Sequence, residues 1–295
     1  MNDNTTAGSR GIAVIGASGT VGQHVVRGLS ERGLPCTAVA RTPPPGLAGL
    51  RGVTWHAADW SVATTDAAWL EGVEQVFMLT PLAPDMVAQA ARLADVLARS
   101  GVQHVVRLSA LGVGYEPGVE LGQVHGEIER DLRERFQLTV LRPNSFMNNY
   151  VAFAGADIRS RNGFSFAQAD GRVSLVDARD IAAVAVQALS DKTHRGRTLE
   201  LTGAVALNNY EVAAQLSRVL GRAIGYSRLD PDNARQTMLG YGMDPWLVRT
   251  LCELDELVRD GRVEHTTGHV EEVLGRPPIS FEDFVEHARE QLTPD

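Results

Sequence analysis

The sequence contains a single lysine, Lys192, among its 295 residues, and nearly all other positive charge is arginine. Several enzyme classes need a lysine at a fixed place in a motif: a Walker phosphate loop, a Schiff-base enzyme and a dehydrogenase with a Tyr-x-x-x-Lys pair. Lys192 lies instead in the loop-like segment SDKTHRGR. The composition therefore argues against all three classes.

Cysteines and long apolar runs are also scarce. Cys36 and Cys252 give neither a disulfide framework nor metal-site spacing. No apolar run approaches the roughly 20 residues that span a bilayer, and MNDNTTAGSR lacks the pattern of a signal peptide. The formal charge is −8, without a basic stripe. We expect a cytoplasmic monomer or small homo-oligomer that acts on a small-molecule substrate and binds no metal, membrane or nucleic acid.

Short apolar runs alternate with helical patterns in the first half of the chain. The expected strands are 11–15, 36–40, 53–57, 75–79, 104–109 and 138–142, and the expected helices lie near 20–32, 84–100 and 123–136. Such short, β-branched runs are typical of parallel strands buried on both faces. The sequence therefore predicts an α/β fold with a Rossmann-type, doubly wound parallel sheet.

A glycine-rich turn, GASGTVG at 16–22, follows the first expected strand. Its glycines allow a tight turn and a close approach of backbone to a pyrophosphate. The helix that follows, with Val21, Val25 and Leu29 on one face, brings N–H groups and partial positive charge to the anion. The spacing is G-x-x-G-x-x-G rather than G-x-G-x-x-G. In this position it predicts dinucleotide binding, with a purely structural turn as the alternative.

The end of the second expected strand indicates which dinucleotide binds. NAD-preferring Rossmann proteins usually carry an acid there, whereas this chain has Arg41, whose guanidinium can pair with a 2′-phosphate. NADP(H) is therefore the expected cofactor. The expected cofactor-binding residues are Gly16, Ser18, Gly19, Thr20, Val21, Gly22, Arg41, Asp59, Trp60, Thr80, Pro81, Leu82, Ser109, Pro143 and Asn144.

After residue 143 the pattern changes. Residues 144–171 are irregular and rich in aromatic residues and asparagine, whereas VDARDIAAVAVQAL predicts a helix capped by Asp180 and RTLELTG predicts a strand. Residues 204–295 are mainly helical. We expect an NADP-binding Rossmann domain of residues 10–145 plus about 174–203. A smaller, mainly helical C-terminal domain, about 146–173 plus 204–295, is expected to cover the substrate.

The ordered combination of these segments resembles the NmrA-like atypical short-chain dehydrogenases. The segments are GASGTVG, the Arg41 position, GVQHVVRLSALGV, LTVLRPNSFMNN, FAQADGRVSLVDARDIA and VEEVLGRPPISFEDFVEHA, and the likeness runs from about 11 to 290. It is strongest toward triphenylmethane reductase-like proteins, NADPH–quinone reductases and festuclavine or agroclavine dehydrogenases. The resemblance implies NADPH binding and places Ser109 near the catalytic serine of the wider family.

The proton-donating pair of ordinary short-chain dehydrogenases is absent. The five tyrosines are Tyr115, Tyr150, Tyr210, Tyr226 and Tyr241, and none has a lysine four residues later. A related branch, which reduces benzylic ethers and isoflavones, carries a catalytic lysine at or within a residue of His125. Histidine can donate a proton near neutral pH, so His125 is the candidate catalytic residue. The competing interpretation is a structural or surface role, in which His125 pairs with Glu129 on a polar face of the helix.

The missing pair also constrains the substrate. Hydride addition to an isolated ketone leaves a localised alkoxide, whereas an iminium ion, quinone or conjugated carbonyl gives a neutral amine or delocalised anion. We therefore expect an NADPH-dependent reductase of activated acceptors, with a role in secondary metabolism. The alternatives are an NADP(H)-sensing regulator without turnover and a non-redox enzyme with His125 as base. The expected pocket residues are Phe146, Met147, Asn149, Tyr150, Tyr241 and Trp246, with core packing as the alternative for each.

Overall fold

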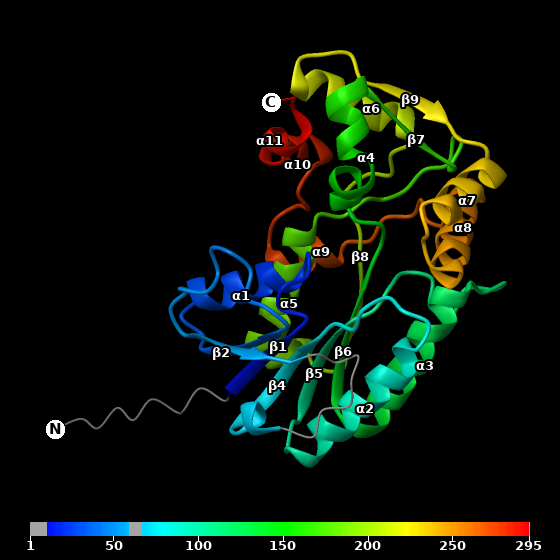
Figure 1. Cartoon of the computed structure of the whole chain (residues 1–295). Helices are drawn as coiled ribbons and strands as arrows, with labels where there is room; N and C mark the ends of the chain where they lie inside the picture. Colours follow the sequence, from blue (N-terminus) through cyan, green and yellow to red (C-terminus); the bar gives the residue numbers. More distant parts are fainter. Residues whose placement is uncertain (1–10, 59–66, 295) are drawn as a thin grey trace. The chain divides into compact units, whose positions relative to one another are not determined.

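The computed structural model describes residues 11–58 and 67–294. Seven strands form a sheet in the order β3-β2-β1-β4-β5-β6-β8 (Figure 1). Their bounds are β1 Gly11–Ile15, β2 Cys36–Ala40, β3 Val53–Ala57, β4 Val73–Met78, β5 His104–Leu108, β6 Gln137–Pro143 and β8 Thr198–Leu201. The pairs from β3 through β6 are parallel. Since β1 lies between β2 and β4, the chain reverses its winding there, and the predicted doubly wound Rossmann sheet is confirmed.

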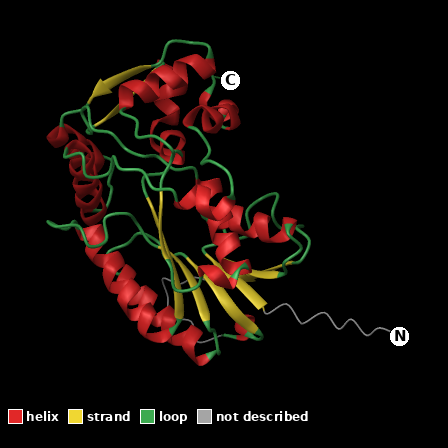
Figure 2. Cartoon of the chain, turned by 180° about the vertical axis from the view of Figure 1, so that it is seen from behind, coloured by secondary structure: helices red, strands yellow, loops and turns green. Residues whose placement is uncertain are grey.

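Helices cover both faces of this sheet (Figure 2). The helices α2 (Met86–Arg99) and α3 (Glu120–Arg135) pack on one face, where their apolar side chains form one buried cluster with residues of β1, β4, β5 and β6. The helix α1 (Gly22–Glu31) lies beside α5 (Ala178–Ser190), so close that a Cβ added to Gly28 would meet Val186 at 3.1 Å. The strands are buried on both faces, which explains their continuous apolar sequences.

The remaining elements belong mainly to the C-terminal part of the chain. They are α4 Asn148–Arg161, β7 Gly163–Phe166, α6 Asn209–Leu220, β9 Gly225–Arg228, α7 Pro231–Gly240, α8 Pro245–Arg259, α9 His269–Leu274, α10 Phe281–His287 and α11 Arg289–Leu292, with short 3-10 turns at Ala68–Leu70 and Lys192–His194. The strands β7 and β9 pair in parallel as a separate two-stranded sheet. The expected mainly helical C-terminal region is confirmed.

Two local predictions were wrong. The segment predicted to be irregular contains the 14-residue helix α4. The helix α5 begins at Ala178, so Asp180 lies inside its first turn. The residue before the helix, Asp177, accepts a hydrogen bond from the backbone N–H of Arg179 at 2.7 Å and satisfies a free donor at the helix start. Asp180 is fully buried and instead binds Arg276 and Ile279, near the C-terminal end of the chain.

The described residues divide into two compact units. The first comprises the described residues up to Ser109, together with Val124–Leu141 and Ala182–Leu199. The second comprises Ala110–Gln123, Arg142–Ile181 and residues 200–294. Within the described ranges, no helix combines the length and apolar character needed to span a membrane.

Candidate functional site

The glycine-rich turn connects β1 to α1 in the first unit. Gly16 has a φ of +77°, which favours glycine, and a Cβ added to Gly22 would lie 2.1 Å from the carbonyl oxygen of Gly16. The N–H of Gly19 donates to that same carbonyl at 2.9 Å. The backbone of the turn is therefore tightly packed, and only glycine fits at positions 16 and 22.

The N-terminus of α1 is open to an anion. Val21 occupies the N-cap position, offers no side-chain cap, and the first turn carries no acidic residue. Ser18 and Thr20 are exposed beside it, while Val21 is 1% exposed and anchors the turn in the core. The N-terminus of a helix that has no side-chain cap and follows a glycine turn suits a pyrophosphate.

Other predicted cofactor residues lie at the same edge of the sheet. Arg41 directly follows β2 and is exposed, and Thr80, Pro81 and Leu82 follow β4. Because β1 pairs with both β2 and β4 in parallel, the carboxyl ends of these strands meet at the glycine turn. Two further predicted residues, Asp59 and Trp60, lie outside the described residues.

A buried polar cluster lies at the end of β5. The Oγ of Ser109 donates to Oε1 of Glu129 on α3 at 2.6 Å, and the two residues are 5% and 3% exposed. Arg107, 1% exposed, donates to the carbonyl of Met78 at 3.1 Å and to Oγ1 of Thr80 at 2.8 Å. Burial lowers the pKa of Arg107 to about 10, and the negative charge of Glu129 opposes this shift. Arg107 therefore remains cationic at neutral pH.

His125 lies four residues before Glu129 on α3 and is 8% exposed. The interpretation of His125 and Glu129 as a solvated helix surface is wrong, because both are buried. The helix also begins at Glu120, which places His125 in the second turn rather than the first. A catalytic role for His125 stays a prediction. Arg107 was not singled out from the sequence, although a charged residue inside the apolar strand HVVRL was a visible signal.

Pro143 is the last residue of β6 and Asn144 follows it, and both residues belong to the second unit. The Nδ2 of Asn144 donates to Oγ of Ser174 at 2.7 Å and to the carbonyl of Val263 at 2.8 Å. Its Oδ1 accepts from the N–H of Ser145 at 2.8 Å. The side-chain amide of Asn144 thus forms hydrogen bonds to other groups of the protein. Its contact with the cofactor remains a prediction.

A cavity of about 340 Å³ lies within the second unit. It brings together four of the six predicted pocket residues, Phe146, Asn149, Tyr150 and Tyr241. Its walls come from α4, β7, α7 and α8. A pocket of this size, lined mainly by apolar and aromatic side chains with a few polar groups, suits a small organic molecule.

The other two predicted pocket residues do not line this cavity. Met147 is 3% exposed and packs in the apolar core of the second unit. Trp246, at the start of α8, donates from Nε1 to Oε1 of Glu120 at 2.6 Å. The prediction missed Asp255 of α8, which does line the cavity. Asp255 is one of several acidic residues on an amphipathic helix, so the sequence carries no signal that it lines the cavity.

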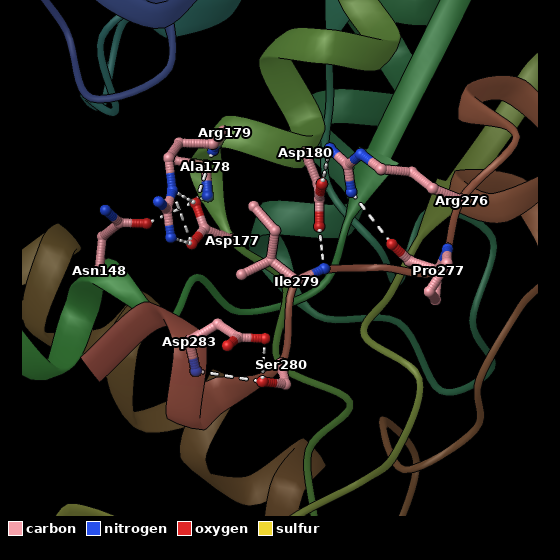
Figure 3. A network of polar contacts seen from close by, with 10 residues as sticks. All are labelled: Asn148, Asp177, Ala178, Arg179, Asp180, Arg276, Pro277, Ile279, Ser280 and Asp283. Carbon is pink, nitrogen blue, oxygen red and sulfur yellow. Dashed lines mark hydrogen bonds and ion pairs between the residues drawn. The ribbon is translucent and has the colours of Figure 1, made fainter. Parts of the chain in front are cut away.

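Polar contacts of Asp180 support the second unit (Figure 3). Its Oδ2 accepts from the N–H of Ile279 at 2.7 Å, and its Oδ1 pairs with Arg276 at 2.7 Å. On the other side of the helix start, Oδ1 of Asn148 accepts from the N–H of Ala178 at 3.2 Å. These bonds connect the first turn of α5 to α4 and to the segment that leads into α10. Residues of α4 also line the cavity.

Comparisons with known proteins agree with this description. The NmrA-like family matches residues 8–285. The NAD(P)H azoreductase of Xenophilus azovorans is 37% identical over 275 residues, covering 92% of this chain and 96% of that protein. The (4-alkanoyl-5-oxo-2,5-dihydrofuran-3-yl)methyl phosphate reductase of Streptomyces griseus is 34% identical over 290 residues, covering 96% and 100%. The NADPH complex of the Escherichia coli quinone oxidoreductase QOR2 has a TM-score of 0.81 at 25% identity, covering 94% and 99%.

Proposed function

Because the chain belongs to the NmrA-like family, we propose that it is an NADPH-dependent reductase that transfers hydride to an activated acceptor. The acceptor is an iminium ion, a quinone or a conjugated carbonyl, and the setting is secondary metabolism. The observation that carries the proposal is the acceptor chemistry of the similar reductases. Their names specify an azo compound, an acyl dihydrofuranone and a quinone, all conjugated electron acceptors.

The first unit holds the cofactor, NADP(H). The glycine turn at 16–22 and the open N-terminus of α1 bind the pyrophosphate, and Arg41 pairs with the 2′-phosphate. Thr80, fixed by Arg107, lies at the same sheet edge. When bound, NADPH supplies a hydride from C4 of its nicotinamide.

The lack of a Tyr-x-x-x-Lys pair matches the proposed acceptors. Iminium reduction gives a neutral amine and needs no acid. Quinone or enone reduction leaves a delocalised anion that takes up one proton, and His125 is the proposed donor. His125 is buried on α3 four residues before Glu129, which accepts from Ser109, and its burial argues against a surface role.

The proposal is tested by following NADPH absorbance with a panel of acceptors. We expect oxidation by a stable iminium salt, 1,4-naphthoquinone and an acyl dihydrofuranone, and none by cyclohexanone. Efficient reduction of cyclohexanone alone would contradict the proposal. Tight NADPH binding without oxidation by any acceptor would instead identify a sensing protein.

A further inference from the structure

The cavity of the second unit holds an acidic side chain that none of the proposed chemistry uses. Among the described residues that line the cavity, Asp255 is the one that carries a charge. Burial raises the pKa of Asp255, while a hydrogen bond from Gln168 and the positive charge of Arg259 oppose that shift. The guanidinium of Arg259 donates to the carbonyl of Ala167 at 2.5 Å. A carboxyl group of raised pKa that lines a cavity is a candidate functional group.

A chain of side-chain hydrogen bonds ends on Asp255. The hydroxyl of Tyr150 donates to Oδ1 of Asn209 at 2.7 Å. The Nδ2 of Asn209 donates to Oε1 of Gln168 at 3.0 Å, and Nε2 of Gln168 donates to Oδ1 of Asp255 at 2.8 Å. In all three bonds the donor lies on the Tyr150 side and the acceptor on the Asp255 side, so the carboxylate is the final acceptor. An ionised carboxylate polarises the groups that donate toward it and so strengthens each hydrogen bond of the chain. The chain therefore favours the anionic form of Asp255.

The donors of this chain are rigidly held. Tyr150 and Asn209 are 5% and 2% exposed. The ring of Tyr150 meets those of Phe164, Phe166 and Phe281 edge to face, with centroids 5.6, 5.6 and 5.3 Å apart. Such packing leaves Tyr150 little rotational freedom and fixes the direction in which the chain is polarised.

The rest of the cavity wall suits a flat cation. Five aromatic rings line it: Phe146, Tyr150, Phe153, Phe166 and Tyr241. The face of an aromatic ring carries negative potential and attracts a cation. A carboxylate and aromatic rings around one cavity both favour a cationic ligand.

We propose that this cavity selects a planar, cationic acceptor whose positive charge lies toward Asp255. This rests on the proposed reductase function and narrows its substrate class to iminium-type cations. In the reaction, a C–H bond forms at the iminium carbon, the C=N π pair becomes the lone pair of the amine nitrogen, and NADPH is oxidised to NADP⁺. The positive charge of the acceptor is lost in this step, because the amine nitrogen regains its lone pair.

Asp255→Asn tests this directly, because asparagine keeps the size and an acceptor for Gln168 but removes the charge. The acceptors are N-methyl-3,4-dihydroisoquinolinium, a permanent cation, and 1,4-naphthoquinone, a neutral molecule of similar size. We expect kcat/KM for the cation to fall roughly 10- to 100-fold, with that for the quinone within about twofold. The control is Glu256→Gln, the same loss of charge at the exposed neighbouring position, which should change neither.

A binding measurement without turnover separates the two proposals. Calorimetry measures the binding of cationic N-methylisoquinolinium and of neutral isoquinoline in the absence of NADPH. We expect Asp255→Asn to weaken the binding of the cation and to leave that of the neutral molecule unchanged. If the variant affects cationic and neutral molecules equally, or neither, the charge selection is overturned. If wild-type protein shows the charge-dependent binding but oxidises NADPH with neither acceptor, the reductase function is overturned and the selection stands.

A pH profile distinguishes charge selection from an acid role for Asp255. Among the described residues, the titratable or charged groups that act on it are Arg259 and Cys252 on the same helix, Tyr226 on β9 and Tyr150 on α4. Asp232 and Arg235 of α7 act in turn on Cys252. For charge selection, kcat/KM of the cation rises as pH increases through the raised pKa of Asp255, because the carboxylate forms. The opposite result concerns the quinone. If quinone turnover falls over the same pH range in wild type but not in Asp255→Asn, Asp255 acts as a proton donor and the proposal is overturned.

Discussion

Ser109 and Glu129 are joined by a 2.6 Å hydrogen bond that ties the end of β5 to the middle of α3. The carboxylate of Glu129 also offsets the buried positive charge of Arg107. Glu129→Gln keeps an acceptor for Ser109 and removes that offset, so we expect a loss of about 2 kcal/mol in the free energy of unfolding. Urea denaturation measures it. The exposed Glu127→Gln on the same helix should change little, and equal stabilities of the two variants would contradict the account.

His125→Ala distinguishes acceptors by their need for a proton. We expect quinone reduction to slow roughly 100-fold, in the range of general acid catalysis, while iminium reduction stays unchanged. The affinity for NADPH, measured by fluorescence titration, should not change. Gln123→Ala, at an exposed position of α3, is the control. Full quinone turnover in His125→Ala would remove the histidine from the mechanism.

Gly22→Ala should disrupt the cofactor turn. The added Cβ would lie 2.1 Å from the carbonyl oxygen of Gly16, so the backbone must move. We expect NADPH affinity to fall at least about tenfold, because the N–H groups of α1 move with it. Gly49→Ala is the matched control, since a Cβ there meets nothing within 4 Å. Wild-type NADPH affinity in Gly22→Ala would show that this turn does not bind the pyrophosphate.

Arg41→Ala tests the choice of dinucleotide. Its guanidinium is exposed at the end of β2 and is proposed to pair with the 2′-phosphate. Loss of a charge-assisted pair should weaken NADPH binding roughly 10-fold or more and leave NADH binding unaltered. Parallel titrations with both dinucleotides measure this, with the exposed Arg51→Ala as control. An equal effect on NADH would assign Arg41 another role.

His104 should make the protein acid-sensitive. It is 0% exposed, and its ring nitrogens lie 3.1 Å from Oε1 of Gln75 and 2.9 Å from Oγ1 of Thr139. Burial, and then the charge of Arg195, lower the pKa of His104 from 6.5 to about 4. Between these values the unfolded chain binds a proton that the folded chain does not, so stability falls as pH drops through this window.

The size of this effect is on the order of 3 kcal/mol. Urea denaturation of wild type and His104→Gln at several pH values checks it. The difference between the two proteins should be largest near neutral pH and shrink toward pH 4. A difference that is constant across this window would contradict the buried neutral histidine.

The sequence was most informative where local pattern and burial coincide. The strands 11–15, 36–40 and 53–57 were predicted with the bounds they have, because each is a short β-branched run between turn residues. The expected helix near 123–136 was likewise found, because Ile128 and Leu132 recur at helical spacing and are both buried in α3. The glycine turn was recognisable because its residues are adjacent in sequence.

Features that depend on distant parts of the chain were not predictable. The helix α4 contains asparagine, aromatic and β-branched residues of low helix propensity, and packing of Tyr150 and Ile158 into the core decides its structure. Asp180 was assigned as a cap because its real partners, Arg276 and Ile279, lie almost 100 residues away. Asp255 was missed for the same reason, because β7 and α4 complete its surroundings.

The most direct test of the central claim is hydride transfer from NADPH deuterated at nicotinamide C4. Both C4-deuterated epimers are incubated with N-methyl-3,4-dihydroisoquinolinium, and the product amine is examined by mass spectrometry and NMR. We predict that one epimer delivers deuterium to the former iminium carbon while the other delivers none. Product without deuterium from either epimer, or no product at all while NADPH binds tightly, would contradict the account.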